Sequence, residues 1–383
     1  MNDLNANTTQ DVHIVKNSLT HLHPYKPPKW ASSLKDIPQY FVKLAQRNTP
    51  IHRWHIPNLP EGFSLSIKRD DLTGSTLSGN KVRKLEFLLA DALNKKCDTI
   101  LTCGGTQSNH CRATALAAKQ LGLDCYLFLR SSEKSTDIGC NGNLLLSKMA
   151  GSNIIVVPNI RYRPGLKKMI EKMAENLKQQ GSSPYIIEIG ASSYTGMFGY
   201  LTAFQEMIEQ NVLEDYDDIV VTAGTGGTAA DIAIANYLTG SKLKCHAVNV
   251  ADNAVYYYDI INKDLRAVGI DVQAEEIIDV IDGYKGKGYA VSTQHELENI
   301  IEISRTTGVL VDPVYNIKAI RGMLTEMKNN PGRFKGKRIL YVHTGGVFDL
   351  YDGKIASLMR SLQSTEKTKQ VLYWGDISDP LPC

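Results

Sequence analysis

The sequence lacks the features that mark membrane, nucleic-acid-binding and disulfide-stabilised proteins. No apolar run is long enough to span a bilayer. The N-terminus, with Asp3 and Asp11 and no apolar core, does not resemble a secretory signal or an Arg-rich transit peptide. The 43 basic and 40 acidic residues give a net charge of only +3, which indicates neither a nucleic acid nor a membrane as partner. The seven cysteines are scattered and include no CxxC pair, so we expect no disulfide framework, no zinc or other metal site, and a cytoplasmic location with reduced thiols.

What is present is the composition of a large globular protein. The chain has 383 residues, of which 43% are hydrophobic and 22% charged, enough for a sizeable core and two domains. There is no internal repeat and no low-complexity tract. From about residue 64 to residue 360, strand-like and helix-like segments alternate, the pattern of an α/β protein with parallel sheets.

Hydrophobic periodicity predicts the main elements and the ends of the fold. We expect helices over 80–93 and 108–121, and strands over 65–68, 99–103, 126–129, 154–157, 185–189, 219–222, 246–250 and 339–342. Residues 1–25 form a polar extension that is expected to be poorly ordered. The polar stretch 364–369 is expected to end a domain, with 371–374 available to dock back on it.

The segment SGNKVRKLE at residues 78–86 places Lys81 where a strand gives way to a helix. A solvated lysine is the usual explanation for such a residue. Here, however, Lys81, Arg83 and Lys84 crowd the positive end of one helix, where cations are disfavoured, and a nearby phosphate or carboxylate would relieve that crowding. Crowding and desolvation also lower the pKa of an amine, as imine formation with a carbonyl cofactor requires.

A second polar turn, CGGTQSNH at residues 103–110, opens the next helix. Free N–H groups and the helix dipole favour an anion such as a carboxylate at Ser108 and Asn109. A lysine suited to imine formation together with a carboxylate site is what an enzyme needs to act on amino acids through pyridoxal phosphate.

The glycine-rich turn at residues 222–229, TAGTGGTA, follows a strand and allows three interpretations. Its glycines let backbone N–H groups approach a single phosphate, and its threonines add hydroxyl donors. It also fits a loose dinucleotide fingerprint, although the acid that such a site needs comes late, at Asp252. A purely structural turn is the third possibility, and we favour the phosphate cradle.

Tyrosines and one histidine complete the set of candidates. The loop DGYKGKGY at residues 282–289 leaves the ring of Tyr284 free to stack on a flat cofactor, and DPVYN at residues 312–316 is a rigid turn bearing Tyr315. The strand ending in HTGG at residues 343–346 faces the carboxyl edge of a parallel sheet. His343 itself is equally well explained as a core histidine.

Together, these motifs resemble the family of pyridoxal-phosphate enzymes that contains D-cysteine desulfhydrase and 1-aminocyclopropane-1-carboxylate deaminase. Five motifs stand in the order of that family between about Pro50 and Gly353: SGNKVRKLE, CGGTQSNH, TAGTGGT, DGYKGKGY with DPVY, and HTGG. The resemblance implies the tryptophan-synthase-β-like fold of type II pyridoxal-phosphate enzymes, in which a small domain is inserted into a large one. We place the small domain at 84–196 and the large one at 26–83 and 197–383.

The resemblance also implies roles for single residues. Lys81 matches the imine-forming lysine, Ser108 the residue that meets the substrate carboxylate, and Tyr284 and Tyr315 the two active-site tyrosines. The implied cofactor-binding set is Asn80, Lys81, Lys84, Asn109, Ala223, Gly224, Thr225, Gly226, Gly227, Thr228, Tyr284 and Thr344. The implied substrate-binding set is Ser108, Asn109, His110, Tyr284, Tyr315 and Asn316.

Two positions separate the branches of this family. The ring-opening deaminases have Glu after the DPVY tyrosine and Leu before the paired glycines, where this chain has Asn316 and Thr344. Thr344 is the residue type of the desulfhydrases, whereas Asn316 differs from the deaminase Glu and also from the small hydroxyl residue of the desulfhydrases. A carboxylate beside the pyridine nitrogen of the cofactor keeps that nitrogen protonated, and the protonated ring withdraws electrons more strongly. A hydroxyl group stabilises that proton less. We therefore expect D-cysteine desulfhydrase, a carbon–sulfur lyase that acts as a homodimer on a small amino acid. The alternatives are the ring-opening deaminase, a nucleotide-binding Rossmann protein, and a relative that binds the cofactor without turnover.

Overall fold

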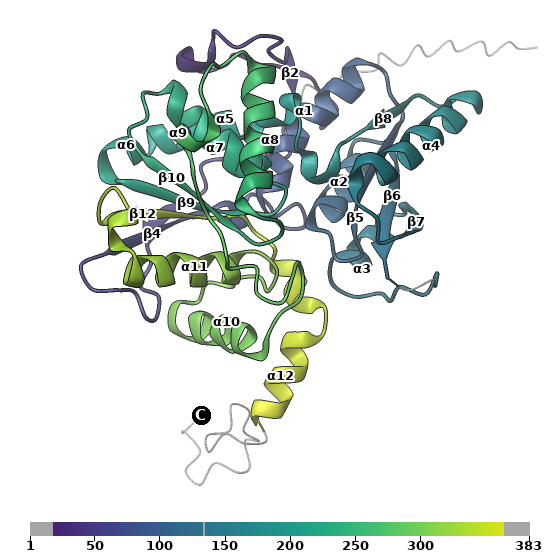
Figure 1. Cartoon of the computed structure of the whole chain (residues 1–383). Coiled ribbons are helices and arrows are strands. Elements are labelled where there is room, and N and C mark those ends of the chain that lie inside the picture. Colours follow the sequence, from purple (N-terminus) through teal and green to yellow (C-terminus); the bar gives the residue numbers. More distant parts are fainter. Residues whose placement is uncertain (1–17, 133–134, 364–383) are drawn as a thin grey trace, which may run out of the picture.

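The computed structural model describes residues 18–132 and 135–363, which contain two large sheets and one two-stranded sheet (Figure 1). The larger sheet has six strands in the order β11-β10-β9-β12-β4-β3. These are β3 (Ile51–Arg53), β4 (Ser64–Arg69), β9 (Asp218–Ala223), β10 (Lys244–Asn249), β11 (Asp279–Ile281) and β12 (Arg338–His343). All neighbours are parallel except β3, which runs antiparallel to β4.

Helices cover both faces of this sheet. One face carries α5 (Tyr194–Glu209), α7 (Gly227–Leu238), α8 (Ala254–Val268) and α9 (Ala274–Ile277), and the other carries α10 (Gln294–Thr307) and α11 (Asn316–Asn329). The central strand β9 is buried along its whole length, and α7 is apolar on nearly every side. A strand buried on both faces needs the continuous apolar run that this chain supplies at 219–221.

The smaller sheet has four parallel strands in the order β7-β6-β5-β8. They are β5 (Thr99–Gly105), β6 (Asp124–Ser131), β7 (Asn153–Pro158) and β8 (Pro184–Ile186), packed with α2 (Asn109–Gln120), α3 (Gly142–Met149) and α4 (Lys167–Gln179). All of them fall inside the segment 84–196 that was predicted as the small domain. Helix α1 (Asn80–Asn94) lies between the two sheets.

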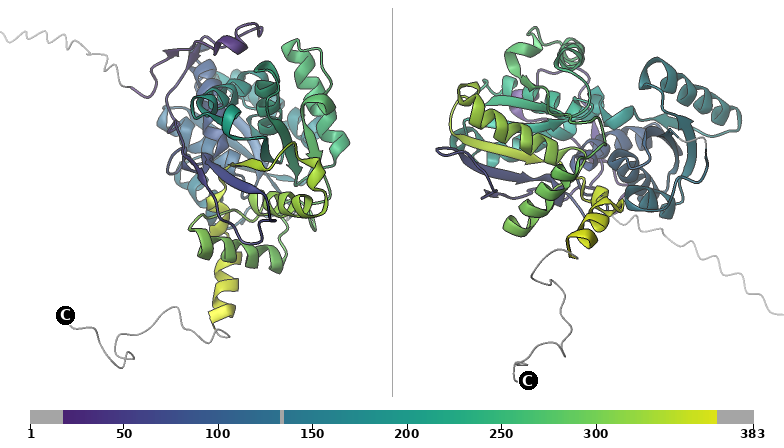
Figure 2. Two further views of the ribbon diagram at one scale, coloured as in Figure 1. Left: turned by 90° about the vertical axis from the view of Figure 1, so that its left-hand side faces the viewer. Right: turned by 60° about the horizontal axis from the view of Figure 1, so that its bottom comes forward.

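The remaining elements are short or peripheral. They are β1 (His23–Pro24), β2 (Tyr40–Phe41), α6 (Val212–Asp215), α12 (Lys354–Gln363), the single-turn helices Lys29–Ala31, Asp70–Leu72, Ile189–Ala191, Pro331–Arg333 and Val347–Tyr351, and a π-helical turn at Tyr162–Leu166. Helix α12 projects away from the body in every view (Figure 2). Among the described residues, no helix has the length and apolar character that crossing a membrane would require.

The predicted helices and strands are confirmed, with small differences at their ends. Three details differ from the expectation. The end of the polar extension joins the fold, because His23–Pro24 pairs with Tyr40–Phe41. The larger sheet is not wholly parallel, since β3 pairs antiparallel with β4. Strand β11 was not predicted. The segments 364–369 and 371–374 lie outside the described residues.

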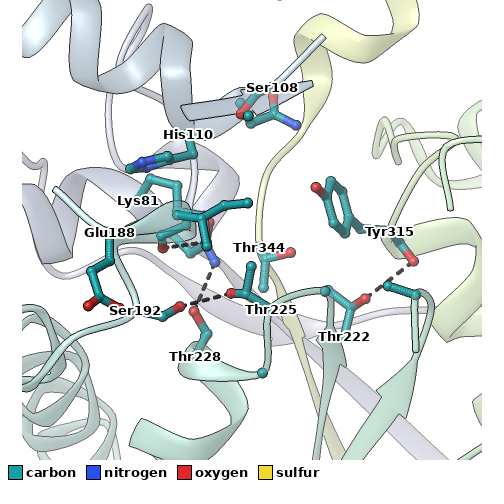
Figure 3. Close-up of a pocket in the computed structure, with 18 of the residues that line it drawn as sticks. Lys81, Ser108, His110, Glu188, Ser192, Thr222, Thr225, Thr228, Tyr315 and Thr344 are labelled. Carbon is teal, nitrogen blue, oxygen red and sulfur yellow. Dashed lines mark hydrogen bonds between the residues drawn. The ribbon is translucent and has the colours of Figure 1, made fainter. Parts of the chain in front are cut away.

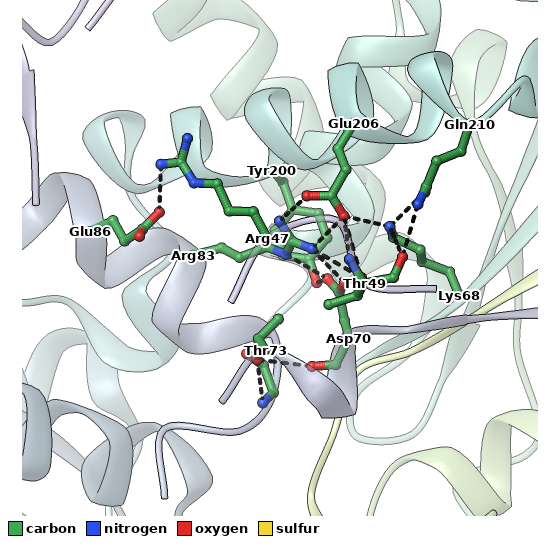
Figure 4. Close-up of polar contacts among 11 residues, drawn as sticks. Arg47, Thr49, Lys68, Asp70, Thr73, Arg83, Glu86, Tyr200, Glu206 and Gln210 are labelled. Atoms are coloured by element: carbon green, nitrogen blue, oxygen red, sulfur yellow. Dashed lines mark hydrogen bonds and ion pairs between the residues drawn. The ribbon is translucent and has the colours of Figure 1, made fainter. Parts of the chain in front are cut away.

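A buried network of charged side chains fixes α1 to the large domain (Figure 4). Arg83 contacts Asp70 through two bonds of 3.0 and 2.8 Å and also donates to Glu206 at 3.1 and 3.0 Å. Lys68 donates to the same Glu206 at 2.5 Å, and Tyr200 donates to Asp70 at 2.8 Å. Because Arg83 is two residues beyond Lys81, this network positions the helix turn that carries Lys81.

Candidate active site

A cavity of about 640 Å³ opens between the two domains at the carboxyl ends of the strands (Figure 3). Eleven of the predicted site residues line it: Asn80, Lys81, Ser108, Asn109, His110, Gly224, Thr225, Gly226, Thr228, Tyr315 and Thr344. Motifs more than 200 residues apart in the sequence thus meet at one place. Five other predicted residues, Lys84, Ala223, Gly227, Tyr284 and Asn316, are not part of the cavity lining.

Lys81 lies in the first turn of α1 and points into the cavity region. Its ammonium donates a hydrogen bond of 3.0 Å to the carbonyl oxygen of Gly190. Burial, together with the positive charge of Lys84, lowers the pKa of Lys81 to about 7, although Asp231 acts in the opposite direction. An amine with this pKa is substantially neutral near pH 7 and is therefore available as a nucleophile.

Lys84 lies one turn further along α1, beneath the glycine-rich turn. Its ammonium is fully buried and forms an ion pair of 2.5 Å with Asp231 on α7. A Cβ atom added at Gly227 would lie 3.1 Å from this ammonium. Lys84 therefore places a positive charge directly behind the turn, where it would attract an anion bound on the other side.

The glycine-rich turn links β9 to the start of α7. Gly226 has φ of +88°, and a Cβ atom there would lie 2.9 Å from the ring of Tyr257. A Cβ atom at Gly224 would lie 2.7 Å from the ring of Tyr315. Both positions therefore require glycine, and the backbone N–H groups at the start of α7 remain open to a phosphate.

The threonines of this turn connect it to neighbouring segments. The hydroxyl of Thr228 accepts from the side-chain amide of Asn80 at 3.0 Å, and the hydroxyls of Thr225 and Ser192 lie 2.8 Å apart. The turn is thus held against both the start of α1 and the segment before α5.

The start of α2 brings two polar side chains to the opposite wall. Ser108 caps the helix by accepting from the backbone N–H of Cys111 at 3.1 Å. The amide nitrogen of Asn109 donates to Asp349 at 2.6 Å, and its amide oxygen is buried without a partner among the described residues. Free N–H groups at this helix start suit a carboxylate.

His110 is buried and has one defined tautomer. The hydroxyl of Thr102 donates to the carbonyl oxygen of Ile187 at 2.8 Å, so it can only accept from Nε2 of His110, 2.7 Å away. Nδ1 is therefore the unprotonated nitrogen, and it has no partner among the described residues. Burial and the charges of Lys81 and Lys84 lower the pKa of His110 to about 3, so the ring is neutral at physiological pH.

The predicted site residue Tyr284, in the loop 282–289, does not line the cavity. The Tyr284 hydroxyl donates to Glu326 at 2.6 Å, and its ring packs near Gly322 of α11, away from the cavity. Tyr289, five residues later, lines the cavity, and its hydroxyl contacts that of Tyr315. Both tyrosines lie in one glycine-rich loop, so the sequence pattern could not distinguish them.

Asn316 does not line the cavity, although its amide nitrogen lies 3.5 Å from the hydroxyl of Thr344, which does. Its amide nitrogen donates to Asp312 at 2.5 Å and to the carbonyl oxygen of Gly345 at 2.9 Å, and its amide oxygen accepts from Tyr341 at 2.8 Å. Thr344, in contrast, lines the cavity. His343 is a core histidine: Nε2 donates to the carbonyl oxygen of Leu310 at 2.8 Å, and Nδ1 accepts from the N–H of Gly345 at 3.1 Å.

Several cavity residues were not predicted from the sequence. Arg130 is the second-last residue of β6, Glu188 follows β8, and Asp264 lies on α8, where burial raises its pKa to about 6. The position of Arg130 and Glu188 at or just after the carboxyl ends of parallel strands was a usable signal. No sequence signal indicated Asp264, because only the packing of α8 brings this residue to the cavity.

Comparison with known proteins agrees with this geometry. Residues 42–345 match the family model described as pyridoxal-phosphate dependent enzyme. The chain belongs to this family. It is 43% identical over 357 residues, 91% of this chain and 89% of the relative, to an Arabidopsis thaliana protein named bifunctional D-cysteine desulfhydrase/1-aminocyclopropane-1-carboxylate deaminase, mitochondrial.

Solved structures support the same assignment. The crystal structure of an ACC deaminase homologue matches with a TM-score of 0.75 and 33% identity, covering 87% of this chain and 100% of the other. Threonine deaminase isoform 2 from Solanum lycopersicum has 14% identity and a TM-score of 0.55 over 83% of each chain, which supports the fold alone. The fold is thus that of type II pyridoxal-phosphate enzymes, as predicted, and the Rossmann alternative is not retained.

The cavity residues fit pyridoxal phosphate as the cofactor. Lys81 offers an amine of lowered pKa, and the turn from Gly224 to Thr228 offers a glycine cradle at a helix start, with Lys84 behind it. The unpartnered atoms of Asn109 and His110 add hydrogen-bonding capacity on the opposite wall. These are the groups that an aldehyde-bearing, phosphorylated ring requires.

Proposed function

We propose that this enzyme is a lyase that converts D-cysteine and water to hydrogen sulfide, pyruvate and ammonia. The observation that carries the proposal is the hydroxyl residue Thr344 in the cavity lining, at the position where ring-opening deaminases have an apolar residue. Asn316, which replaces the deaminase glutamate, faces Asp312 rather than the cavity. Loss of a good leaving group such as a thiolate requires a weaker electron sink than opening a cyclopropane ring.

The residues of the cavity would have separate roles in the reaction. Bound pyridoxal phosphate would withdraw electrons from the α-carbon of the amino acid. Lys81 would hold the cofactor and then move the proton at the α-carbon, for which an amine with a pKa of about 7 is suited. The helix start at Ser108 and Asn109 would bind the substrate carboxylate.

The paired tyrosines would supply a proton to the leaving sulfur. Burial and the neighbouring Tyr289 raise the pKa of Tyr315 well above its usual value, so its hydroxyl remains protonated. A phenol in contact with a second phenol can donate its proton and be reprotonated through the pair. This assignment replaces Tyr284 with Tyr289 and retains Tyr315.

The ring-opening deaminase remains the second candidate. The name of the Arabidopsis relative includes both activities, and it is 43% identical to this chain. A cyclopropane amino acid has no proton at its α-carbon, so Lys81 would not serve as the base there, and the reaction would yield 2-oxobutyrate and ammonia.

Product analysis separates the two candidates. The purified enzyme with pyridoxal phosphate is incubated with D-cysteine, L-cysteine or 1-aminocyclopropane-1-carboxylate, and sulfide, pyruvate and 2-oxobutyrate are measured. We expect sulfide and pyruvate in equal amounts from D-cysteine, little from L-cysteine, and negligible 2-oxobutyrate. Lys81→Ala is the control and should abolish all turnover. Faster formation of 2-oxobutyrate than of sulfide would overturn the substrate assignment while leaving the cofactor assignment intact.

The cytoplasmic location, the homodimer, and the absence of nucleic-acid and membrane partners stay predictions. The Arabidopsis relative is mitochondrial by name, so similarity does not carry a cytoplasmic location over to this chain.

A further inference from the structure

The glycine-rich loop between β11 and α10, residues 282–293, contains no strand or helix. Its middle part folds as two successive turns. The backbone N–H of Gly288 donates to the carbonyl oxygen of Lys285 at 3.3 Å, and that of Val291 donates to the carbonyl oxygen of Gly288 at 3.2 Å. Tyr289, which lines the cavity, is the second residue of the second turn. The conformation of this turn therefore sets where the phenol of Tyr289 lies.

The backbone directly after Tyr289 is in a conformation that needs support from outside the loop. Ala290, the third residue of the second turn, has a φ of +60°. Residues with a side chain rarely adopt this left-handed region, and they keep it only where surrounding contacts impose it. We therefore looked for a contact from another element that holds the turn.

Lys318 on α11 makes this contact. The residue is 1% exposed, and its ammonium donates to three backbone carbonyl oxygens of the loop. The three distances are 2.7, 2.7 and 3.0 Å, to the carbonyl oxygens of Lys285, Gly288 and Val291. These are the residues at which the two turns begin and end. Because carbonyl oxygens only accept, three such bonds need three N–H hydrogens, and the charged ammonium is the form that supplies them.

Two carboxylates balance the buried charge. Burial lowers the pKa of Lys318, whereas the charges of Glu296 and Asp312 raise it. A Cβ atom at Gly286, in the first turn, would lie 3.0 Å from a carboxylate oxygen of Glu296 and 3.8 Å from the ammonium of Lys318. Gly286 also has a φ of +63°. Glycine is therefore required at this point, where the loop backbone comes close to both charged groups.

Helix α11 holds both tyrosines of the pair. Tyr315 is the N-cap residue of α11, and Lys318 lies three residues later on the same helix. Among the described residues, the hydrogen bonds that reach 285–291 from outside the loop are the three from Lys318 and the contact between the hydroxyls of Tyr289 and Tyr315. One tyrosine is thus fixed by its place in the helix and the other through the ammonium.

We propose that Lys318 is a positioning residue: by closing the two turns of the loop, its ammonium holds the hydroxyl of Tyr289 against that of Tyr315. Lys318 itself does not line the cavity. The proposal rests on the proposed function in that the tyrosine pair supplies the proton to the leaving sulfur. Without the ammonium, three carbonyl oxygens lose their donor and the left-handed backbone at Ala290 loses its support, so the turn would rearrange.

Tryptic cleavage of the holoenzyme tests the contact without relying on activity. Lys285 and Lys287 are exposed in the first turn and are the positions at which trypsin can cut this loop. Lys318→Met keeps a long side chain but removes the charge and the three donors. We expect cleavage after the two loop lysines, identified by mass spectrometry, to be severalfold faster in this variant, because local opening exposes the backbone. Lys328→Met is the matched control, since Lys328 is exposed on the same helix, and its cleavage rate should equal that of the wild type.

Steady-state kinetics in a double-mutant cycle distinguish positioning from a general structural effect. Lys318→Met should lower kcat for sulfide release by on the order of 10²-fold, the effect of misplacing a catalytic group by about 1 Å. Its Kd for pyridoxal phosphate should stay that of the wild type, because Lys318 lies outside the cavity lining. In the Tyr289→Phe background, the same substitution should have little further effect on kcat, because both changes act through one hydroxyl.

The outcomes that contradict the proposal are specific. An equal fall in kcat in both backgrounds, or wild-type cleavage rates in Lys318→Met, would overturn it. If Lys318→Met does not fold, Lys318→Gln, which keeps two N–H donors, replaces it in both measurements. A wild type that releases no sulfide would overturn the proposed function, which is a distinct outcome, and with it the catalytic part of this proposal. The cleavage rates would then decide whether Lys318 holds the loop.

Discussion

The amine of Lys81 shows how the surroundings of a single residue set its chemistry. Burial and Lys84 lower its pKa from 10.5 to about 7, so the neutral form predominates only above that pH. We expect the rate at which cofactor-free enzyme binds pyridoxal phosphate covalently to rise up to about pH 8 and then level off. The measurement is the appearance of visible absorbance after mixing at each pH. Nα-acetyl-lysine in solution is the reference, and its rate should keep rising toward pH 10. The same continued rise in the enzyme would contradict the lowered pKa.

Two tyrosines of one loop offer a second test at the residue scale. Tyr289 contacts Tyr315 at the cavity, whereas Tyr284 donates to Glu326 on α11. Tyr289→Phe should reduce kcat for sulfide release by on the order of 10²-fold, the lower range for losing a general acid. Tyr284→Phe should leave kcat within about twofold and lower the free energy of unfolding by about 1 kcal/mol. The reverse result in steady-state kinetics would restore Tyr284 to the site.

Asn316 shows why a family difference cannot be tested by simple exchange. Its amide links Asp312 to Gly345 in a fully buried position. Asn316→Glu would place a second carboxylate beside Asp312, so we expect a loss of about 3 kcal/mol or more in the free energy of unfolding. Asn316→Ala should cost about 1–3 kcal/mol, because Asp312 and the Gly345 carbonyl lose a donor. Urea denaturation of the cofactor-free proteins measures both, and an Asn316→Glu protein as stable as the wild type would contradict the expected repulsion by Asp312.

At the scale of elements, the glycine-rich turn before α7 has little room for side chains at its glycines. Gly226 combines a φ of +88° with a close approach to the ring of Tyr257, whereas Gly240 has a φ of +95° and open space around it. Both Gly→Ala changes carry the cost of a left-handed backbone, about 1–2 kcal/mol. Only Gly226→Ala should also displace the turn, and we expect its Kd for pyridoxal phosphate to rise more than tenfold. Equal Kd values for the two variants, measured by absorbance titration, would remove the turn from the cofactor site.

The elements themselves could be predicted from the sequence because their signals are local. Each signal depends on a few adjacent residues. Examples are the apolar runs of β5 and β9 and the spacing of Val82, Leu85 and Leu89 on α1. The positions of Lys81 and of the glycine-rich turn followed from motifs at strand ends. The choice between Tyr284 and Tyr289, the inward position of Asp264, and the contact between Asn109 and Asp349 depend on packing between distant segments. Asn109 and Asp349 are 240 residues apart, and no pattern within either segment indicates the other.

At the scale of the whole molecule, the buried network around Arg83 joins segments that the sequence separates widely. Lys68 and Arg83 are balanced by Asp70 and Glu206, and the four side chains are nearly inaccessible to solvent. Such a network adds little stability over an apolar core of the same shape, but removing one member leaves an unbalanced buried charge. Its position beneath the first turn of α1 gives it a structural role in keeping Lys81 in place.

Glu206→Gln tests this network through its dependence on pH. The ammonium of Lys68 and the guanidinium of Arg83 lower the pKa of Glu206, so its contribution is complete above the unfolded value, near 4.3, and is lost as the pH falls through the folded value. We expect Glu206→Gln to lose about 3–5 kcal/mol of the free energy of unfolding at pH 7. The difference from the wild type should shrink below pH 4, where the wild type also loses this charge.

Glu214→Gln is the control, because Glu214 and Lys242 form an exposed pair at 3.5 Å, and its effect should be at most about 0.5 kcal/mol at any pH. Urea denaturation of the cofactor-free proteins at pH 7 and pH 3 measures these differences. A deficit in Glu206→Gln that does not change between the two pH values would show that the carboxylate charge is not what the network requires.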